Sequence, residues 1–550
     1  MKIIIIGSVA AGTSVAAKAR RNDEQADITL YNADYDISYS ICGIPYFLGG
    51  EVDTLGALTP RSAPWFKKRY NVDIHTRHEV TEIDPEQQKV KVKNLDTDEV
   101  IEDNYDTLVF ATGATPIAPS IPGVEKDHVF QIRTIQNTAA VDTYMRDNSP
   151  KKVTIVGAGF IGLEMAEQLI QKGLEVTIVQ RSNQVMPHFD KDMAYRVEEH
   201  LEPKGVNLLL NEEATAVSNN SVETKSGRVI ESDMVILAVG VRPNTKLAKE
   251  IGVKLGTTGA IAVNSKMQTN LTDVYAVGDC AESFSLITEK PIYRPLGSTA
   301  NKMGRIAGDV ITGGDLEHRG ILGTGILRVF DLAVGHTGLS EKEAIESGYD
   351  VEVLHNIKPA SADYLGGKEL VIKALADRET EGILGVQIVG INGVDKRIDV
   401  FATAITFKAK AEDLFHLDLA YAPPFSTTKD PVMYTGMALQ NAIDKKNKLI
   451  TPQELKNRME SGEKIQVIDT RAAKQFEASN VNGAINIPMA NLRTEVKELD
   501  PEKPTVTYCN SGVTGNAAQN VLRNMGFKEV YNLSGGNKNY QIFNKGKEQN

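Results

Sequence analysis

Two glycine-rich turns, each between a short apolar strand and a helix, constrain the fold of this 550-residue chain most strongly. The clearer one is Gly157-Ala158-Gly159-Phe160-Ile161-Gly162, which follows the apolar run 153–156 and precedes a helix-forming stretch. A strand, a GxGxxG turn and a helix in this order bring backbone N–H groups and a helix N-terminus against a pyrophosphate. We therefore expect a Rossmann-like fold that binds a dinucleotide through Gly157, Gly159, Phe160, Ile161 and Gly162.

The next predicted strand, 175–179, ends in Gln180-Arg181. An acidic residue at this position favours NAD, whereas a nearby arginine accommodates the 2′-phosphate of NADP. Arg181 thus favours NADPH, although it could also be an ordinary solvated charge, so the choice between NADH and NADPH stays open. This NAD(P)H site is expected to include Gln180, Arg181, Val239 and Gly240.

The chain begins with a second copy of the same pattern. Residues 2–6 (KIIII) predict a buried parallel strand, followed by Gly7-Ser8-Val9-Ala10-Ala11-Gly12 and a helix. Val9 replaces the middle glycine of the pattern, and Asn32 stands where an acidic residue usually binds ribose. Taken alone, this turn predicts a dinucleotide site and a plain βαβ turn about equally.

Three later segments support two dinucleotide sites. Residues 107–116 and 233–244 each predict a strand followed by glycine and proline, and residues 272–279 (TDVYAVGD) predict a strand that delivers Asp279. By itself Asp279 could be a capped strand end, but the five segments in this order resemble the two-dinucleotide disulfide reductase flavoproteins. That resemblance implies FAD in the first fold. It implies FAD contacts from Gly7, Val9, Ala10, Ala11, Gly12, Asn32, Ser40, Val80, Ala111, Thr112, Gly113, Arg133, Asp279, Leu296, Ala300 and Phe425.

The three cysteines, Cys42, Cys280 and Cys509, are far apart and form no CxxC pair, so we expect neither a disulfide framework nor a metal site. Cys42 could be a small core residue. Its neighbours, however, are glycine, proline and hydroxyl side chains, and a helix that starts just after it would favour a thiolate. We expect a redox cysteine at Cys42, and packing for Cys280.

The segment SxxxCGxPY around Cys42 resembles the coenzyme A disulfide reductase group, and the resemblance extends to about residue 440. Tyr46 or Phe47 stands where glutathione-reductase-type enzymes carry a second cysteine. Cys42 must then cycle through a mixed disulfide, a persulfide or a sulfenic acid.

The same resemblance implies a homodimer in which a partner tyrosine, matching Tyr421 and less closely Tyr364, donates a proton to the leaving thiolate. These tyrosines could instead only fill the dimer interface. It also implies a coenzyme A pocket, although each lysine in it could be an ordinary surface charge. The pocket residues are Ser14, Lys18, Arg21, Ser38, Lys67, Lys68, Arg69, Asn301 and Lys429.

The last hundred residues resemble a single-domain rhodanese module. Three sequence features support this resemblance. They are the strand 465–470 with Arg471, the segment 483–488 (GAINIP), and a strand that ends at Cys509 before a small loop and a helix. Backbone N–H groups in such a loop stabilise a thiolate or persulfide. Asn510 and Thr514 stand where arginines are common, which puts thiosulfate chemistry in doubt. A sulfur-carrying Cys509 and a degenerate structural domain are the alternatives.

We therefore expect an α/β protein with two Rossmann-like dinucleotide-binding domains, an α+β dimerisation domain and a C-terminal α/β rhodanese domain. The expected boundaries are 1–150 with 260–320 for FAD, 151–259 for NAD(P)H, 321–440 for dimerisation and 450–546 for the rhodanese module.

As a whole the chain resembles the coenzyme A disulfide reductase–rhodanese fusion proteins. The resemblance implies a flavoprotein that passes electrons from NAD(P)H through FAD to Cys42 and reduces coenzyme A disulfide, coenzyme A persulfide or polysulfide. Cys509 would exchange sulfane sulfur. One alternative is an NADH oxidase or peroxidase with a sulfenic acid at Cys42, although such relatives usually carry a histidine where this chain has Ala10. Another is a non-catalytic sulfur-sensing protein, suggested by Asn32 and the altered rhodanese loop.

The net charge of −11 disfavours nucleic acid and anionic membrane surfaces as partners. The N-terminal apolar run is too short for a secretory signal, and no run approaches the ~20 apolar residues of a spanning helix. We expect a cytoplasmic protein that acts on a small-molecule thiol, disulfide or persulfide.

Overall fold

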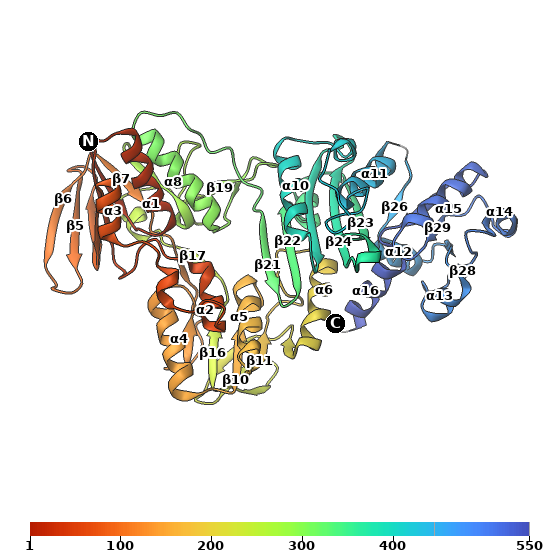
Figure 1. The fold of residues 1–550 in the computed structure, drawn as a ribbon, viewed down its shortest axis with the longest axis horizontal. Coiled ribbons are helices and arrows are strands. Elements are labelled where there is room, and N and C mark those ends of the chain that lie inside the picture. Colours follow the sequence, from red (N-terminus) through yellow and green to blue (C-terminus); the bar gives the residue numbers. More distant parts are fainter. Residues whose placement is uncertain (445, 549–550) are drawn as a thin grey trace. The chain divides into compact units, whose positions relative to one another are not determined.

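The computed structural model describes residues 1–444 and 446–548. They fold into two compact units (Figure 1). The first comprises Met1–Arg181 and Gly205–Gly323, and the second comprises Ser182–Lys204 and the described residues from Thr324 onward. The expected fold class is confirmed, because each unit is built from α/β elements with the predicted mixture of parallel and antiparallel sheets.

The first sheet of the first unit is parallel, with the strand order β18-β7-β1-β2-β3. Its strands are β1 (Lys2–Ile6), β2 (Asp27–Asn32), β3 (Asp73–Thr76), β7 (Thr107–Phe110) and β18 (Val274–Ala276). The isoleucines of β1 are buried between β2 and β7, as a central parallel strand requires.

Two helices of this unit, α1 (Ala10–Asn22) and α8 (Gly297–Ile311), lie side by side (Figure 1). Glycine allows the close approach: a Cβ at Gly304 would lie 2.4 Å from the carbonyl oxygen of Ala11, and one at Gly308 would lie 2.5 Å from that of Val15. Helix α8 is thereby fixed against the helix that follows the first glycine turn.

A second parallel sheet in this unit has the order β12-β11-β10-β16-β9. Its strands are β9 (Val129–Gln131), β10 (Lys152–Val156), β11 (Glu175–Val179), β12 (Val206–Leu209) and β16 (Met234–Leu237), and α5 (Phe160–Gln171) follows the second glycine turn. The carboxyl ends of β10 and β16 share one edge, where a doubly wound sheet binds its ligand.

The remaining strands of the first unit form small antiparallel sheets, and further helices accompany them. The antiparallel strands are β4 (His78–Asp84), β5 (Lys89–Asn94), β6 (Val100–Asn104), β8 (Ala114–Pro116), β13 (Ala214–Val217), β14 (Ser221–Thr224), β15 (Val229–Glu231), β17 (Val241–Pro243), β19 (Ser283–Phe284) and β20 (Pro291–Ile292). The helices are α2 (Ile44–Gly49), α3 (Ala63–Tyr70), α4 (Ile135–Asn148) and α7 (Lys246–Glu250).

The second unit contains an antiparallel sheet with the order β21-β22-β25-β24-β23. Its strands are β21 (Gly325–Val329), β22 (Leu332–Gly338), β23 (Val351–Pro359), β24 (Glu369–Asp377) and β25 (Ile383–Gly390). The helices that belong with it are α6 (Lys191–Leu201), α9 (Glu341–Glu346), α10 (Val394–Thr406) and α11 (Pro431–Ile443).

The C-terminal part of this unit is built on a parallel sheet with the order β26-β30-β29-β27-β28. Its strands are β26 (Leu449–Ile450), β27 (Gln466–Asp469), β28 (Ile485–Asn486), β29 (Thr505–Tyr508) and β30 (Val530–Leu533). Its helices are α12 (Pro452–Glu460), α13 (Ala473–Ala478), α14 (Leu492–Glu495), α15 (Val513–Asn524) and α16 (Gly536–Glu548). The central strand β29 ends at Cys509.

Among the described residues, no helix combines the length and the apolar character that crossing a lipid bilayer requires.

Candidate functional site

The turn between β1 and α1 depends on glycine at both ends. Gly7 has a φ of +107°, and a Cβ there would lie 2.2 Å from the carbonyl oxygen of Ala111. At Gly12 a Cβ would lie 2.0 Å from the carbonyl oxygen of Gly7. Val9, Ala10 and Ala11 complete the turn and open α1. The tight turn and the helix N-terminus fit a pyrophosphate even though Val9 replaces glycine.

The turn between β10 and α5 has the same geometry with a more open centre. A Cβ at Gly157 would lie 2.4 Å from the carbonyl oxygen of Ala238, and one at Gly162 would lie 2.1 Å from that of Gly157. At Gly159, by contrast, no atom of the described chain lies within 4 Å of the added Cβ. Open space at the middle glycine is what lets a pyrophosphate approach the backbone.

Two polar side chains at the ends of β2 and β11 already form hydrogen bonds within the protein. Asn32 is buried, and its Nδ2 donates to the carbonyl oxygens of Asp34 and Asp36 at 3.0 and 3.2 Å, which leaves Oδ1 to accept from a ribose hydroxyl. Gln180 accepts from the backbone N–H of Ala158 at 2.9 Å and so ties the strand end to the second glycine turn. Arg181 is exposed, and Val239 and Gly240 follow β16.

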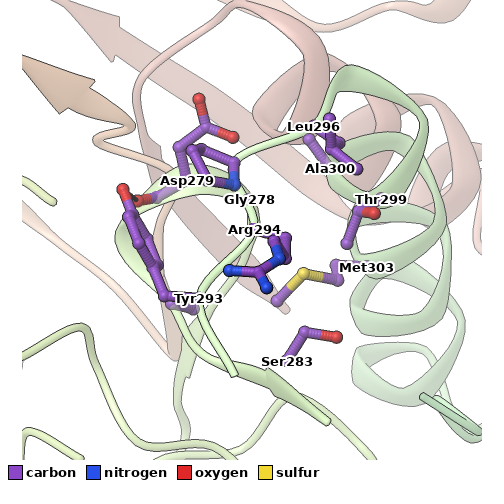
Figure 2. Close-up of a pocket in the computed structure, with 11 residues that line it drawn as sticks. Gly278, Asp279, Ser283, Tyr293, Arg294, Leu296, Thr299, Ala300 and Met303 are labelled. Carbon is purple, nitrogen blue, oxygen red and sulfur yellow. Dashed lines mark hydrogen bonds between the residues drawn. The ribbon is translucent and has the colours of Figure 1, made fainter. Parts of the chain in front are cut away.

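Asp279 lies in the turn after β18, together with several other predicted FAD contacts. It accepts from Nη2 of Arg133 at 3.0 Å, and the hydroxyl of Tyr293 donates to its carbonyl oxygen at 2.9 Å. Asp279, Leu296 and Ala300 line one small cavity at the start of α8 (Figure 2). Arg133 and Asp279, which are 146 positions apart in sequence, are thus brought together.

The other predicted FAD contacts of the first unit lie on neighbouring elements. Ala111, Thr112 and Gly113 follow β7, and the hydroxyl of Thr112 donates to the carbonyl oxygen of Asn244 at 2.7 Å. Val80 belongs to the core cluster that contains β1, and Ser40 is exposed just before Cys42.

Cys42 lies in a short 3₁₀ turn, Ile41–Gly43, directly before α2, and it is exposed. The surrounding protein raises the pKa of its thiol by desolvation, the negative charge of Glu164 raises it further, and Arg133 acts in the opposite direction. Desolvation and the charge of Glu164 therefore oppose the thiolate expected from the sequence. Tyr46, at the place of a second cysteine, donates to Oε1 of Glu164 at 3.1 Å.

Glu164 was missed in the sequence, because it lies on α5 and approaches Cys42 only in the folded chain. Cys280, as expected, is a packing residue: it is fully buried, its thiol donates to the carbonyl oxygens of Phe110 and Val277, and burial raises its pKa.

A cavity of about 550 Å³ gathers several of the predicted coenzyme A residues. Ser14, Lys18, Arg21, Ser38 and Asn301 line it. The hydroxyl of Ser14 donates to Oδ1 of Asn301 at 2.7 Å, and Lys18 pairs with Asp309 at 2.9 Å.

The sequence missed two further cations of this cavity, Arg61 and Arg305. Arg305 is one helical turn after Asn301 on α8, so its place on the same face could have been read from the spacing. The expected cluster Lys67, Lys68 and Arg69 is not among the lining residues, and Lys67 pairs with Asp73 at 2.8 Å.

Besides Cys509, four predicted site residues belong to the second unit. Tyr364, Tyr421, Phe425 and Lys429 are all exposed, with Tyr364 at 78% and Phe425 at 71%. The segment that carries Tyr421 is anchored by Asp430, which accepts from Nε and Nη2 of Arg397 at 3.0 and 2.8 Å. The approach of Tyr364 and Tyr421 to Cys42 stays a prediction. So do the contacts of Phe425 with FAD and of Lys429 with coenzyme A.

Cys509 begins a tight loop at the carboxyl end of β29. Its Sγ accepts from the backbone N–H of Gly512 at 3.2 Å, and its carbonyl oxygen accepts from that of Asn537 at 2.8 Å. Gly515 must be glycine here, because a Cβ would lie 2.4 Å from Oδ1 of Asn532. The inward N–H group supports a sulfur anion at this cysteine.

Comparison with protein families divides the chain into three matched segments. Residues 1–295 match the pyridine nucleotide-disulphide oxidoreductase family, residues 326–431 match the dimerisation domain of that family, and residues 451–542 match the rhodanese-like domain.

Curated relatives cover the part before the rhodanese-like segment. The NAD(P)H sulfur oxidoreductase (CoA-dependent) of Pyrococcus furiosus is 39% identical over 446 residues, which is 80% of this chain and 99% of that protein. A protein named NADH oxidase in Methanocaldococcus jannaschii is 38% identical over 450 residues, 81% of this chain and 99% of that protein.

Two solved structures match almost the whole chain. Reduced CoADR-RHD of Bacillus anthracis has a TM-score of 0.95 at 38% identity and covers 98% of both chains. An NAD-dependent persulfide reductase from A. fulgidus has a TM-score of 0.90 at 35% identity, covering 98% of this chain and 100% of the other. The likeness therefore includes both the catalytic part and the C-terminal domain.

Proposed function

Because the chain belongs to the pyridine nucleotide-disulphide oxidoreductase family and carries a rhodanese-like domain, we propose that it is an NAD(P)H-dependent flavoenzyme that reduces coenzyme A disulfide, coenzyme A persulfide or polysulfide. Cys42 is the reacting sulfur. Cys509 exchanges sulfane sulfur with the thiol product. The observation that carries the proposal is the exposed Cys42, which has Tyr46 where related enzymes have a second cysteine. It lies in the same unit as the two glycine-rich turns that fit dinucleotides.

FAD belongs to the first fold, along the turn Gly7–Gly12 and against Asp279, and NAD(P)H belongs to the second, along Gly157–Gly162. When bound and reduced by NAD(P)H, the flavin would supply the two electrons that return an oxidised Cys42 to its thiolate. Asp279, held by Arg133, is the group that orients the cofactor. Asn32 offers Oδ1 to the ribose, and Arg181 offers a charge to a 2′-phosphate.

The chemistry of Cys42 begins with attack of its thiolate on a sulfur of the substrate. A new sulfur–sulfur bond forms to Cys42, the substrate bond breaks, and a thiolate leaves with the electron pair. The leaving thiolate accepts a proton or a hydrogen bond from a tyrosine, for which Tyr421 and Tyr364 are the candidates. The match of residues 326–431 to a dimerisation domain supports supply of this tyrosine by the partner in a homodimer.

The cavity of about 550 Å³ is the proposed coenzyme A site. Its four cations, Lys18, Arg21, Arg61 and Arg305, suit a ligand that carries a pyrophosphate and a 3′-phosphate. Ser14, Ser38 and Asn301 offer hydrogen bonds beside them. This concentration of positive charge contrasts with the acidic character of the whole chain.

Replacement of Cys42 tests the proposal. We expect Cys42→Ser to abolish NAD(P)H-dependent turnover of coenzyme A disulfide, coenzyme A persulfide and polysulfide, because the serine hydroxyl cannot form the sulfur–sulfur intermediate. Turnover is followed by nicotinamide absorbance, and stopped-flow spectroscopy checks that the bound flavin is still reduced. Cys280→Ala is the matched control, since it removes a thiol that only packs. Turnover by Cys42→Ser at the wild-type rate contradicts the proposal.

The name of one relative favours a second candidate, an NADH oxidase with a sulfenic acid at Cys42. Oxygen and peroxide consumption, measured separately from disulfide and persulfide reduction, separates the two. Oxygen consumption that exceeds disulfide and persulfide reduction would favour the oxidase.

A further inference from the structure

We propose that Lys358, on β23 of the antiparallel sheet, belongs to the sulfur-transfer site at Cys509 and supplies the positive charge that the 509–514 loop lacks. The inference rests on the proposed role of Cys509 in exchanging sulfane sulfur. It assigns to that site a residue from outside the rhodanese-like segment.

The loop itself offers little uncompensated positive charge. Asn510 and Thr514 are neutral, and the nearby Arg471 reaches Oδ1 of Asn510 at 3.1 Å. Arg471 is already bound to Asp469, with contacts of 2.6 to 3.1 Å to both carboxylate oxygens. Lys538, whose backbone N–H donates to the carbonyl oxygen of Asn510, forms an ion pair through its side chain with Glu369. Both cations are thus neutralised by carboxylates.

Strand β23 runs beside the segment that holds this loop. It is an edge strand, and the backbone N–H of His355 donates to Oγ of Ser534 at 2.7 Å. At the other end of the strand, Pro359 is paired with Glu369, the partner of Lys538. Lys358 lies between these two anchoring points.

The segment 534–538 also forms backbone hydrogen bonds with the Cys509 loop. The N–H of Asn537 donates to the carbonyl oxygen of Cys509 at 2.8 Å, and the N–H of Lys538 donates to that of Asn510 at 3.0 Å. This segment therefore contacts β23 through Ser534 and Cys509 through Asn537.

The side chain of Lys358 is held in place by an aromatic ring. Its Nζ lies 4.1 Å from the ring centroid of Tyr434 on α11, and Nζ of Lys429 lies 5.8 Å from the same centroid. Burial lowers the pKa of Lys358, and the negative charge of an ionised Cys509 acts in the opposite direction.

A cation at this position would balance the negative charges of the two reactants. The thiolate of Cys509 attacks the outer sulfur of a persulfide anion, RSS⁻, forming the Cys509 persulfide, and RS⁻ leaves with the electron pair of the broken sulfur–sulfur bond. One sulfur atom is transferred without net oxidation. Because both reactants are anionic, a nearby ammonium stabilises their approach and the persulfide that results.

Alkylation of the full-length chain tests the inference. Wild type, Lys358→Gln, Lys358→Arg and Lys368→Gln are treated with iodoacetamide over a range of pH, and modification of the Cys509 peptide is quantified by mass spectrometry. Lys358→Gln is expected to slow alkylation of Cys509 at pH 7 by about three- to ten-fold and to move the profile to higher pH. Lys358→Arg keeps the charge and is expected to retain the wild-type profile.

Two controls are internal to the experiment. Lys368 is an exposed lysine just before β24, so Lys368→Gln removes the same charge and is expected to leave Cys509 unchanged. Alkylation of Cys42 in the same samples is also expected to stay constant. Should Lys358→Gln fail to fold by circular dichroism, Lys358→Met preserves the aliphatic contact with Tyr434 and takes its place.

An unchanged Cys509 profile in the neutral Lys358 variant would overturn the inference, as would an equal shift in Lys368→Gln. The proposed sulfur-transfer role has its own test, in which wild-type protein is incubated with coenzyme A persulfide. The absence of a persulfide on Cys509 by mass spectrometry would contradict that role. The alkylation profile is measured without any sulfur donor, so the two failures are distinguishable.

Discussion

Cys42 has Glu164 as the largest electrostatic contribution to its raised pKa after desolvation. We predict that Glu164→Gln lowers this pKa, because it removes a negative charge that disfavours the thiolate. Alkylation of Cys42 by iodoacetamide at pH 7 should become about three- to ten-fold faster. Glu175→Gln, at an exposed position on β11, is the control. An unchanged rate in Glu164→Gln would show that Glu164 does not act on the thiol.

Single residues differ in how far the sequence predicts them. Gly157 and Cys42 could be located because their signals, a turn pattern and a loop composition, lie within a few neighbouring residues. Glu164 and Arg61 could not, because each reaches its site through an element that only the tertiary fold brings there. Lys67 shows the converse, since a basic cluster in sequence does not line the cavity.

The segment that carries Tyr421 is held at its end by a buried ion pair. Arg397 is 1% exposed, and Asp430 also accepts from Ser426 and from the backbone N–H of Val432 at 2.7 and 2.9 Å. Asp430→Ala should destabilise the second unit by about 3 kcal/mol, since it leaves the buried guanidinium without its carboxylate. Thermal unfolding monitored by circular dichroism measures the loss. Asp399→Ala, which removes an exposed carboxylate on α10, is the control and should change the midpoint little.

The same ion pair predicts a pH dependence. Burial alone would raise the pKa of Asp430, but the hydrogen bonds from Arg397 and Val432 outweigh it and hold the pKa below its usual range. A depressed pKa in the folded chain means that the stabilisation is complete above the unfolded value, about 4, and is lost as pH falls below it. Acid should therefore lower the melting temperature of the wild type more than that of Asp430→Asn.

Whole elements were predictable where hydrophobic pattern and turn chemistry agree, as in β1, β10 and β29. The position of α6 beside Lys373 of β24 could not be predicted in this way. Within the second unit Asp192 on this helix binds Nζ of Lys373 at 3.0 Å, and Asp190 just before it binds the same atom at 3.2 Å. Local sequence around residue 190 gives no sign of a lysine on β24.

At the scale of the whole molecule, the two cysteines should be separable. We predict that Cys509→Ser leaves reduction of coenzyme A disulfide within about two-fold of wild type, because that reaction requires only the thiol at Cys42. Formation of a protein persulfide at residue 509 should disappear. Nicotinamide oxidation and intact-protein mass spectrometry measure the two outcomes. Loss of disulfide reduction in this variant would show that the two sulfur sites act as one.

The predicted order of the modules along the chain came from local signatures for the two dinucleotide-binding folds and the rhodanese-like module, and from the resemblance alone for the dimerisation domain. The matched families follow that order. The sequence could not predict contacts between modules, such as the hydrogen bond from His355 to Ser534, because they depend on which strand of the antiparallel sheet lies at its edge.

Strand β23 has a neighbour on one side only, and on its other side the N–H of His355 bonds to Ser534 of the C-terminal module. An unpaired strand margin invites addition of a strand from another molecule and hence self-association. The hydrogen bond to Ser534 occupies one N–H group of this edge, so the C-terminal module leaves less of the strand open to such pairing.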